Sequence, residues 1–413
     1  MIRLIFILLI SIYTFQLWGQ TKGEWIVQYF NVSNSFHEKS NNEYQLLSSS
    51  LSIYLVNDSE TLSKSEASEL FSEHGKIKHL FRNQEVYPRT YIPDDELYFE
   101  QWNMDVINAP NVWEETTGGR SETGEEIVMA VLDDGYDINH IELRNNLWIN
   151  PNELPGDGID NDGNGYIDDH QGVNIEDKND IHPESDHGTQ VVGIMAAQGD
   201  NNTGIAGMNW NTKVLFVSGV SNVGEIITGY EYVYDLKKRY LESDGTDGAN
   251  IVVTNLSSGL EFAFPSQLPS WCEIYDLLGS VGVLSVCATA NLDVNIEIEG
   301  DMPTLCTSDY LIMVTNTDTF DEKVQYAAQN KTHVDLGAPG ELITTLDIKN
   351  EYSRISGTSA STPHVAGAVA LFFTIPCQSL TDLIKINPTA AALTIKNAIL
   401  NGTAPNVTLD ETV

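Results

Sequence analysis

Three short segments of the chain place a reactive side chain beside an apolar run. Asp133 and Asp134 follow the apolar part of VMAVLDDG, His187 precedes that of SDHGTQVVGIMAA, and Ser359 lies within ISGTSASTPHVAGAVA. A serine hydroxyl becomes an effective nucleophile when an imidazole takes its proton, and the imidazole needs a carboxylate to orient it. Each residue alone could be a turn residue, a surface histidine or a helix cap. Together, the three residue types predict nucleophilic catalysis.

The order Asp, His, Ser and the sequence around each residue resemble the subtilisin-like serine peptidases, or subtilases; it is the order of subtilisin itself. The resemblance covers roughly residues 95–400. It includes AVLDDGYDINHIEL, HGTQVVGIMAA with the GIAG that follows, and GTSAS-x-PH-x-AG. It implies that Asp133 orients the base, that His187 is the general base and that Ser359 is the nucleophile, with Asp134 a neighbour of the site.

The same resemblance implies an oxyanion donor and two walls of a substrate cleft. Asn291, in ATAN, matches the family's oxyanion asparagine, although Ala290 stands where the family usually has glycine. The backbone N–H of Ser359 would be the second donor. NLSSG resembles the segment that pairs with an extended peptide substrate, and GDMPT at 300–304 suggests further cleft wall. The implied substrate-binding residues are Ser257, Ser258, Gly259 and Ala288.

An acidic, glycine-rich stretch, DGIDNDGNGYIDD at 157–169, lies between the Asp and His segments. From Asp160 it follows an EF-hand loop to the ninth position, but Gln171 stands at the twelfth in place of the bidentate glutamate. The alternative is a solvated acidic loop. Clustered carboxylates without a nearby basic residue favour a cation, and all-oxygen ligands on a flexible loop favour structural Ca²⁺ over magnesium. The candidate ligands are Asp157, Asp160, Asp162, Asn164, Tyr166, Asp168 and Asp169.

Short apolar runs rich in Val and Ile recur from about residue 97, and the elements that they form must position the candidate catalytic side chains. They lack polar alternation, which is typical of strands buried on both faces. Helical segments are predicted between them at 189–198, 225–242, 266–282 and 359–373. Alternating strands and helices predict an α/β fold with a doubly wound, mostly parallel sheet and helices on both faces, as in subtilisin. Ligands would bind at the carboxyl ends of the strands.

Residues 20–92 have a different pattern of apolar and polar residues. EWIVQYF and IKHLF read as strands, an amphipathic run spans 63–75, and a linker rich in proline and charge follows. These features predict a small α+β unit. The resemblance implies an inhibitor-like propeptide that the enzyme cuts at about 85–95, which would make the chain a zymogen. The catalytic domain would span 93–413, and the absence of the family's usual Gly-rich continuation leaves open an incomplete C-terminal end.

The first residues, MIRLIFILLISIYTFQLWGQ, have one Arg followed by a mostly apolar run. This pattern predicts a secretory signal peptide at 1–19, with a membrane anchor as the alternative. The chain has 21 Lys plus Arg against 59 Asp plus Glu, a formal net charge of −38. Such an excess repels phosphate groups, which argues against nucleic acid or membrane-surface partners.

Four cysteines in a secreted chain allow up to two disulfides, with buried free thiols as the alternative. Spacing alone cannot select the pairing. We favour Cys272–Cys306, because both residues should flank the cleft side of neighbouring elements.

These features predict a secreted serine endopeptidase, extracellular or periplasmic and monomeric. It would act on polypeptide substrates, be inhibited by its own propeptide and be braced by calcium. The alternative is a non-catalytic secreted calcium-binding protein on a subtilase scaffold. That alternative predicts the loss of a triad residue or of Asn291, and none is lost.

Overall fold

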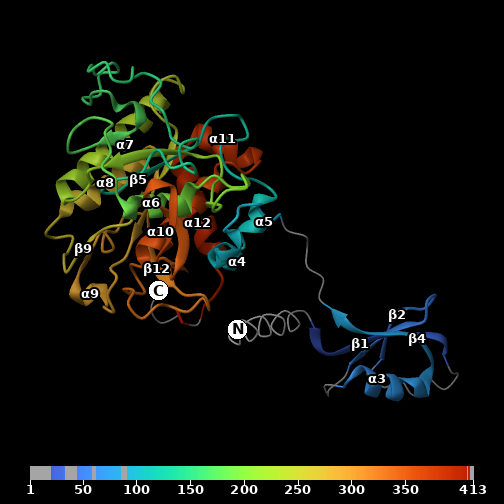
Figure 1. Ribbon diagram of the computed structural model, residues 1–413. Coiled ribbons are helices and arrows are strands. Elements are labelled where there is room, and N and C mark those ends of the chain that lie inside the picture. Colours follow the sequence, from blue (N-terminus) through green and yellow to red (C-terminus); the bar gives the residue numbers. More distant parts are fainter. Residues whose placement is uncertain (1–19, 33–43, 58–61, 85–90, 407, 410–413) are drawn as a thin grey trace, which may run out of the picture. The chain divides into compact units, whose positions relative to one another are not determined.

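The computed structural model describes residues 20–32, 44–57, 62–84, 91–406 and 408–409. It divides the chain into two compact units, Met1–Arg89 and Thr90–Val413 (Figure 1). The predicted signal peptide at 1–19 and part of the predicted linker lie outside the described residues. Within the described ranges, no helix has the length and apolar character needed to cross a membrane.

The smaller unit contains an antiparallel sheet in the order β2-β3-β1-β4 and one α-helix. Trp25, Val27 and Tyr29 alternate along β1 and pack against Ala67 and Phe71 of the helix, as expected for a sheet with one buried face. The two predicted strands fall in β1 and β4, whereas β2 and β3 follow a polar segment and were not predicted. The elements are β1 (Gln20–Val32), β2 (Tyr44–Ser48), β3 (Ile53–Asn57), α3 (Lys64–Phe71), η1 (Ser72–His74) and β4 (Gly75–Gln84).

The larger unit is built on a seven-stranded parallel sheet in the order β13-β12-β10-β8-β5-β7-β6. On one side of β5 the strands follow in chain order (β8, β10, β12 and β13), whereas on the other side β7 lies next to β5 and β6 lies at the edge. The connections therefore lead from β5 toward both edges of the sheet, and the direction of winding changes beside β5. In such sheets this is where ligands bind. The strands are β5 (Val128–Leu132), β6 (Val173–Asn174), β7 (Lys213–Ser218), β8 (Ile251–Leu256), β10 (Leu284–Ala288), β12 (Leu311–Thr317) and β13 (Leu336–Pro339).

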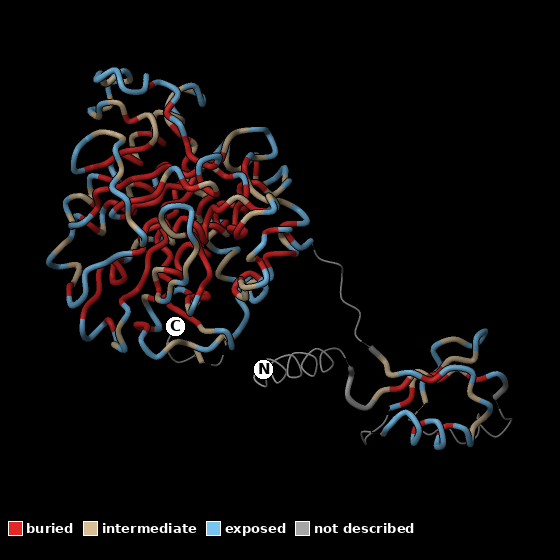
Figure 2. The backbone as a smooth tube through the Cα atoms, in the orientation of Figure 1, coloured by how far each residue is buried: buried red, intermediate tan, exposed pale blue. Residues whose placement is uncertain are grey.

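Helices cover both faces of this sheet, which confirms the predicted doubly wound α/β fold. Successive residues of a strand point to opposite faces. Ala130 and Leu132 therefore pack in the core with α7 and α8, and Met129 and Val131 in the core with α6, α10 and α12. Figure 2 shows the buried interior that results. The helices are α6 (Asp186–Ala196), α7 (Val223–Glu242), α8 (Pro269–Ser280), α10 (Thr358–Phe372) and α12 (Pro388–Gly402).

Shorter elements complete the larger unit. Two antiparallel ribbons, β9–β11 and β14–β15, lie outside the main sheet. Their bounds, with those of the short helices, are η2 (Tyr98–Glu100), α4 (Trp102–Val106), α5 (Ala109–Trp113), η3 (Asp169–Gln171), β9 (Leu260–Glu261), α9 (Ile296–Glu299), β11 (Asp301–Met302), β14 (Ile343–Asp347), η4 (Ile348–Asn350), β15 (Glu351–Ile355) and α11 (Gln378–Ile386).

One disulfide joins Cys272 of α8 to Cys306. This confirms the favoured pairing. Cys287 and Cys377 are free thiols, the first of them buried.

Candidate active site

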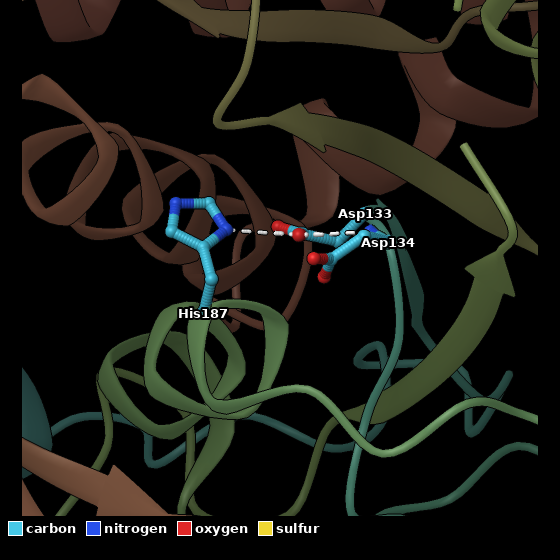
Figure 3. A group of neighbouring side chains, drawn as sticks. All are labelled: Asp133, Asp134 and His187. Carbon is cyan, nitrogen blue, oxygen red and sulfur yellow. Dashed lines mark hydrogen bonds and ion pairs between the residues drawn. The ribbon is translucent and has the colours of Figure 1, made fainter. Parts of the chain in front are cut away.

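Asp133 and His187 meet at the carboxyl end of β5. Asp133 is the first residue after that strand, and His187 lies in the first turn of α6. His187 Nδ1 lies 2.9 Å from Asp133 Oδ1, and the two side chains point toward one another with Asp134 alongside (Figure 3). Asp133 Oδ1 also accepts the N–H of Asp134 at 2.9 Å. Asp133 is buried, whereas Asp134 is exposed. The pair has the geometry of a carboxylate that orients an imidazole.

Two glycines let α6 approach the loop after β5 closely enough for this contact. A Cβ on Gly188 would lie 2.1 Å from the carbonyl oxygen of Gly135. A Cβ on Gly135 would lie 2.2 Å from that of Pro183. No side chain fits at these separations, so the backbones themselves pack and hold His187 beside Asp133.

The pair has perturbed proton affinities. Burial of the imidazole lowers the pKa of His187, but the hydrogen bond to Asp133 and the charges of Asp133, Asp134 and Asp186 outweigh it, so the pKa is raised overall. Burial raises the pKa of Asp133, against the opposing effect of its bond to His187. An imidazole whose protonated form is stabilised by a carboxylate is suited to accept a proton during a reaction.

Ser359 is the second residue of α10 and projects toward β8. Its hydroxyl donates to the carbonyl of Ser257 at 3.0 Å, and the Ser257 hydroxyl donates to the carbonyl of Ser359 at 3.0 Å. Among the hydrogen bonds of residues 91–406, none joins Ser359 to His187. A serine hydroxyl reaches a different partner by rotating about its Cα–Cβ bond. Catalytic contacts are often formed only when a substrate is bound.

Asn291 follows the end of β10 and is oriented by the start of α10. Its Oδ1 accepts the N–H of Thr358 at 2.9 Å and the Thr358 hydroxyl at 3.1 Å. Gly357, at φ +128°, precedes the helix, and a Cβ there would lie 2.9 Å from the same Oδ1. Because Oδ1 is occupied by donors, the amide NH₂ group of Asn291 remains available as a donor.

A pocket of about 80 Å³ opens beside these residues. It brings Ser359 and Asn291 together with every predicted substrate-binding residue. Two acidic residues, Glu261 and Asp301, also line it. The sequence indicated only the GDMPT segment that contains Asp301. The lining residues are Ser257, Ser258, Gly259, Glu261, Ala288, Thr289, Ala290, Asn291, Asp301, Thr358 and Ser359.

The acidic loop forms a carboxylate cluster from Glu153, Asp162 and Asp169, one oxygen of each lying within 4.8 Å of the others. Asp162 and Asp169 were predicted ligands. Glu153 was not singled out, although an acid at the start of the same insert is a visible signal. Glu153 Oε1 accepts the N–H groups of Asn161 and Asp162, whereas Oε2 is buried without a hydrogen bond. Such an oxygen suits a cation.

The other predicted ligands lie around this cluster and shape the loop. Asp160 accepts three backbone N–H groups, and Asp168 accepts those of Asp157 and Gly158. Asn164 donates to Asp169 at 2.7 Å. The ring of Tyr166 packs edge-on against that of Tyr232. These carboxylates cap turns of the loop.

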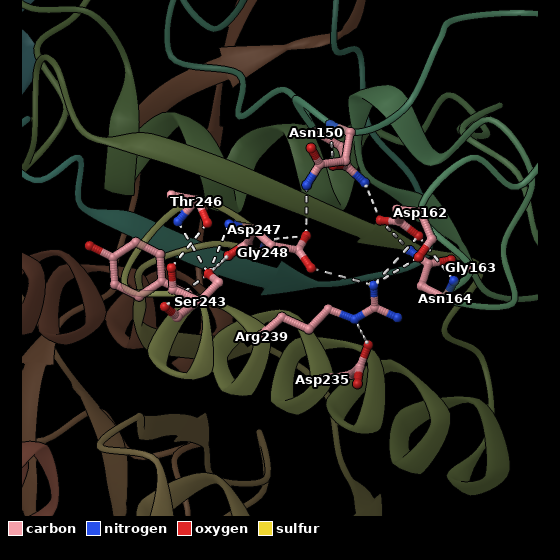
Figure 4. Close-up of polar contacts among 12 residues, drawn as sticks. Asn150, Asp162, Gly163, Asn164, Asp235, Arg239, Ser243, Thr246, Asp247 and Gly248 are labelled. Atoms are coloured by element: carbon pink, nitrogen blue, oxygen red, sulfur yellow. Dashed lines mark hydrogen bonds and ion pairs between the residues drawn. The ribbon is translucent and has the colours of Figure 1, made fainter.

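A basic side chain also reaches the loop, contrary to the sequence interpretation that none lies nearby. Arg239 of α7 donates to the carbonyl of Asp162 at 3.1 Å and lies 3.9 Å from its carboxylate (Figure 4). It also pairs with Asp235 and Asp247. The helix that supplies Arg239 is distant in sequence, so local charge patterning could not reveal it. One cation offsets only part of the charge of the loop.

Comparison with known families identifies the class of protein that this fold and site define. The description "Subtilase family" applies to residues 124–408, and the chain belongs to this family.

Individual relatives agree with this assignment. The chain is 30% identical over 272 residues to the major intracellular serine protease of Bacillus subtilis, covering 64% of this chain and 72% of that protein. It is 26% identical over 322 residues to subtilisin-like protease 1 of Plasmodium berghei, covering 72% of this chain and 50% of that one. The chain therefore spans about half the length of that curated relative.

Solved structures show the same fold. A protease of Pseudoalteromonas arctica aligns with a TM-score of 0.55 at 22% identity, over 76% of this chain and 93% of that one. The epidermin leader peptide processing serine protease of Staphylococcus aureus aligns with a TM-score of 0.54 at 18% identity, over 94% of this chain and 95% of that one.

Proposed function

We propose that the chain is a serine endopeptidase in which Ser359 is the nucleophile, His187 the general base and Asp133 the group that orients it. The observation that carries this proposal is the 2.9 Å contact between His187 Nδ1 and Asp133 Oδ1, which leaves Nε2 available for the serine proton. Ser359 Oγ would bond to the peptide carbonyl carbon as its proton passes to His187. His187 would then protonate the departing amine, leaving an acyl-enzyme that water hydrolyses.

Asn291 and the backbone N–H of Ser359 would stabilise the oxyanion of this reaction. The charge develops on the former carbonyl oxygen, so fixed N–H donors directed at that position lower the barrier. Thr358 occupies Oδ1 of Asn291, which supports the donor role of the amide nitrogen.

Labelling of the processed protein, from which the proposed propeptide has been removed, with a fluorophosphonate probe tests this proposal. We expect the processed wild-type protein to be labelled and Ser359→Ala, freed of the same segment by an added protease, not to be. Ser361→Ala, which changes a buried serine of the same helix, is the matched control and should still be labelled. Absence of labelling in folded, processed wild-type protein would instead favour a non-catalytic calcium-binding protein.

The segment predicted as a propeptide and linker, 20–92, would inhibit the enzyme and be removed by the enzyme itself. Together with the predicted signal peptide, this describes a monomeric zymogen secreted to the exterior or periplasm. The support is the compact unit that ends at Arg89. If purified Ser359→Ala protein were still cut in the linker in a protease-free host, self-processing would be wrong.

The acidic loop would hold a structural Ca²⁺ through Glu153, Asp162 and Asp169. The ion would be the positive partner of Glu153 Oε2, which is buried without a hydrogen bond. A route to the active site exists, because His182 contacts the carbonyl of Gln171 at 3.0 Å and the next residue, Pro183, accepts the N–H of Tyr136 at 2.7 Å. Order in the loop would therefore be transmitted to the segment that carries Asp133.

Chelation tests the calcium proposal. EDTA should lower the melting temperature and the activity, and calcium should restore both. Glu153→Gln should weaken this dependence, whereas Glu242→Gln, a change of equal charge at an exposed residue outside the loop, should preserve it. An unchanged melting temperature and activity after chelation would rule the proposal out.

A further inference from the structure

The pocket beside Ser359 is lined by two acidic side chains that face each other across a ribbon. Asp301 of β11 and Glu261 of β9 are directly opposed in register. Directly opposed residues of an antiparallel pair place their side chains on the same face, where like charges repel. The chain therefore carries an unfavourable charge pair next to its proposed nucleophile.

Among the residues that the structure describes, no basic side chain forms an ion pair with either carboxylate. Lys, Arg and His are absent from the pocket lining, and none of the ion pairs within the described ranges includes Asp301 or Glu261. Asp301 is 2% exposed. Its Oδ2 accepts the N–H of Ala290 at 3.0 Å and the Thr304 hydroxyl at 2.5 Å, whereas Oδ1 accepts no hydrogen bond from the described residues. A buried carboxylate of this kind lacks a positive partner.

The segment that carries Asp301 is held in place. The backbone carbonyl of Asp301 accepts the N–H of Leu305 at 3.1 Å, and the carbonyl of Pro303 accepts the N–H of Cys306 at 2.8 Å. Cys306 is joined to Cys272 of α8 by the disulfide. A carboxylate fixed in this way binds a partner without first having to be ordered.

We propose that this pocket selects a lysine or arginine side chain on the residue whose carbonyl Ser359 attacks. Ser359 and Asn291 both line this pocket. When a substrate carbonyl lies between them, the side chain of the residue that carries this carbonyl is the one closest to the pocket. The stem of a basic side chain would pass Ala288 and Gly259, and its charge would reach Asp301 and Glu261. This inference rests on the proposed peptidase function and specifies its substrate class.

The chain itself offers one such residue where self-processing is proposed. Arg89 is the sole basic residue in EVYPRTYIPDD, residues 85–95. It is followed by Thr90, the first residue of the larger unit. The same selectivity would therefore cut the chain between Arg89 and Thr90.

Matched fluorogenic peptides test the inference directly. The purified processed protein is assayed on Glu-Val-Tyr-Pro-Xaa substrates, where Xaa is Lys, Arg or norleucine, the last being an apolar analogue of lysine. We expect kcat/KM for Lys and Arg to exceed that for norleucine by about tenfold or more, because a hydrogen bond to a charged group is worth at least that factor. Equal values would overturn the inference.

Charge-neutralising variants locate the selectivity. Asp301→Asn and Glu261→Gln should each reduce the ratio of kcat/KM for Lys over norleucine severalfold. Glu299→Gln removes an equal charge from an exposed residue outside the pocket lining and should leave the ratio unchanged. Asp301 also holds Ala290, so Asp301→Asn could disturb folding. The variant of the exposed residue Glu261 then provides the test. If Glu261→Gln leaves the ratio of kcat/KM for Lys over norleucine unchanged, the inference is overturned.

Processing of the full chain gives an independent readout. The wild-type protein should acquire Thr90 as its new N-terminus, Arg89→Lys should be cut at the same bond, and Arg89→Gln should be cut slowly or elsewhere. Unchanged cutting of Arg89→Gln at this bond would contradict the proposed selectivity.

Failure of the inference is distinguishable from failure of the peptidase proposal. If Ser359 is labelled by the fluorophosphonate and all peptides are cleaved equally, the peptidase proposal is supported and the proposed basic selectivity is wrong. If Ser359 is not labelled and no peptide is cleaved, both the peptidase proposal and the proposed selectivity are wrong.

Discussion

Asp134 is an exposed carboxylate beside the Asp133–His187 pair, and its charge helps to raise the pKa of His187. A general base acts in its neutral form, so kcat/KM should be full above the pKa of His187 and fall as the pH drops through it. The raised pKa places this acid limb above the ordinary value of 6.5.

Asp134→Asn should move the acid limb of kcat/KM to lower pH, because it removes one of the charges that favour the protonated imidazole. The pH profile should be measured with the norleucine peptide, whose binding involves no substrate charge. Glu184→Gln, an exposed change nearby in sequence that is not among the causes of the shift, is the control. An unmoved limb in Asp134→Asn would exclude His187 as the titrating base.

Replacing Asn291 should affect turnover more than binding. Asn291→Ala removes the proposed oxyanion donor, so kcat should fall by about 10²–10³-fold, the range established for subtilisin itself. KM should change little. Steady-state kinetics with an unchanged melting temperature would establish this, and a comparable rise in KM would point to a ground-state role.

The selectivity for a basic substrate residue should depend on pH through Asp301. Burial raises the pKa of Asp301 to about 6, with Glu261 adding to the shift and the bonds from Thr304 and Ala290 opposing it. Selectivity should be full well above that pKa and decline as the pH falls through it. The ratio of kcat/KM for Lys over norleucine, measured from pH 8 to 5, cancels the titration of His187. A constant ratio would exclude Asp301 as the charge that is sensed.

The sequence could single out Asp133, His187 and Ser359 as candidates because each lies in a local segment with a recognisable pattern, and the structure brings Asp133 and His187 together. It could not reveal Glu153 with its unmatched oxygen, or Glu261 opposite Asp301, because these relationships arise only when distant segments pair. The contact of Arg239 with Asp162 was missed for the same reason.

The disulfide should support the pocket wall that carries Asp301. It closes a segment whose ends are 34 residues apart, so replacing both Cys272 and Cys306 with serine should cost roughly 2–4 kcal/mol of stability. KM for the Lys peptide should rise, because the turn at 301–306 would lose its anchor. Thermal unfolding and kinetics measure both effects. Cys377→Ser, which removes a free thiol, should leave both unchanged.

At the scale of elements, the sequence predicted strands that form a continuous apolar run better than very short strands or strands of mixed polarity. β5, β8 and β10 are fully buried, and their apolar runs were recognised. β6 has two residues, and the ribbon β14–β15 mixes polar and apolar positions. Such elements are stabilised by their neighbours in the fold, which a pattern along the sequence does not contain.

Lys237 couples the stability of the whole larger unit to pH. It is buried on α7, its Nζ donates to Asn250 Oδ1 at 2.7 Å, and burial lowers its pKa to about 7. The unfolded chain holds the lysine proton more tightly than the folded one. Stability should therefore rise with pH between about 7 and the ordinary lysine value of 10.5, and be lower below 7.

Lys237→Met should raise the melting temperature at pH 6 more than at pH 9, because it removes a charge whose burial is unfavourable. Lys238→Met changes the half-exposed neighbour and should shift the melting temperature little at either pH. A loss of stability in Lys237→Met at pH 6 would mean that the bond to Asn250 outweighs the cost of desolvation.

The buried, unmatched oxygen of Glu153 would make the active fold conditional on the medium around it. Calcium modules that work outside cells bind the ion at about 10⁻⁴–10⁻³ M, a range far above that of intracellular calcium sensors. If the chain is exported and its loop binds calcium in that range, as proposed, the loop would lack its ion while the chain is being made and become ordered only outside the cell. The carboxylates that weaken the ion-free loop would then protect the producing cell from its own peptidase.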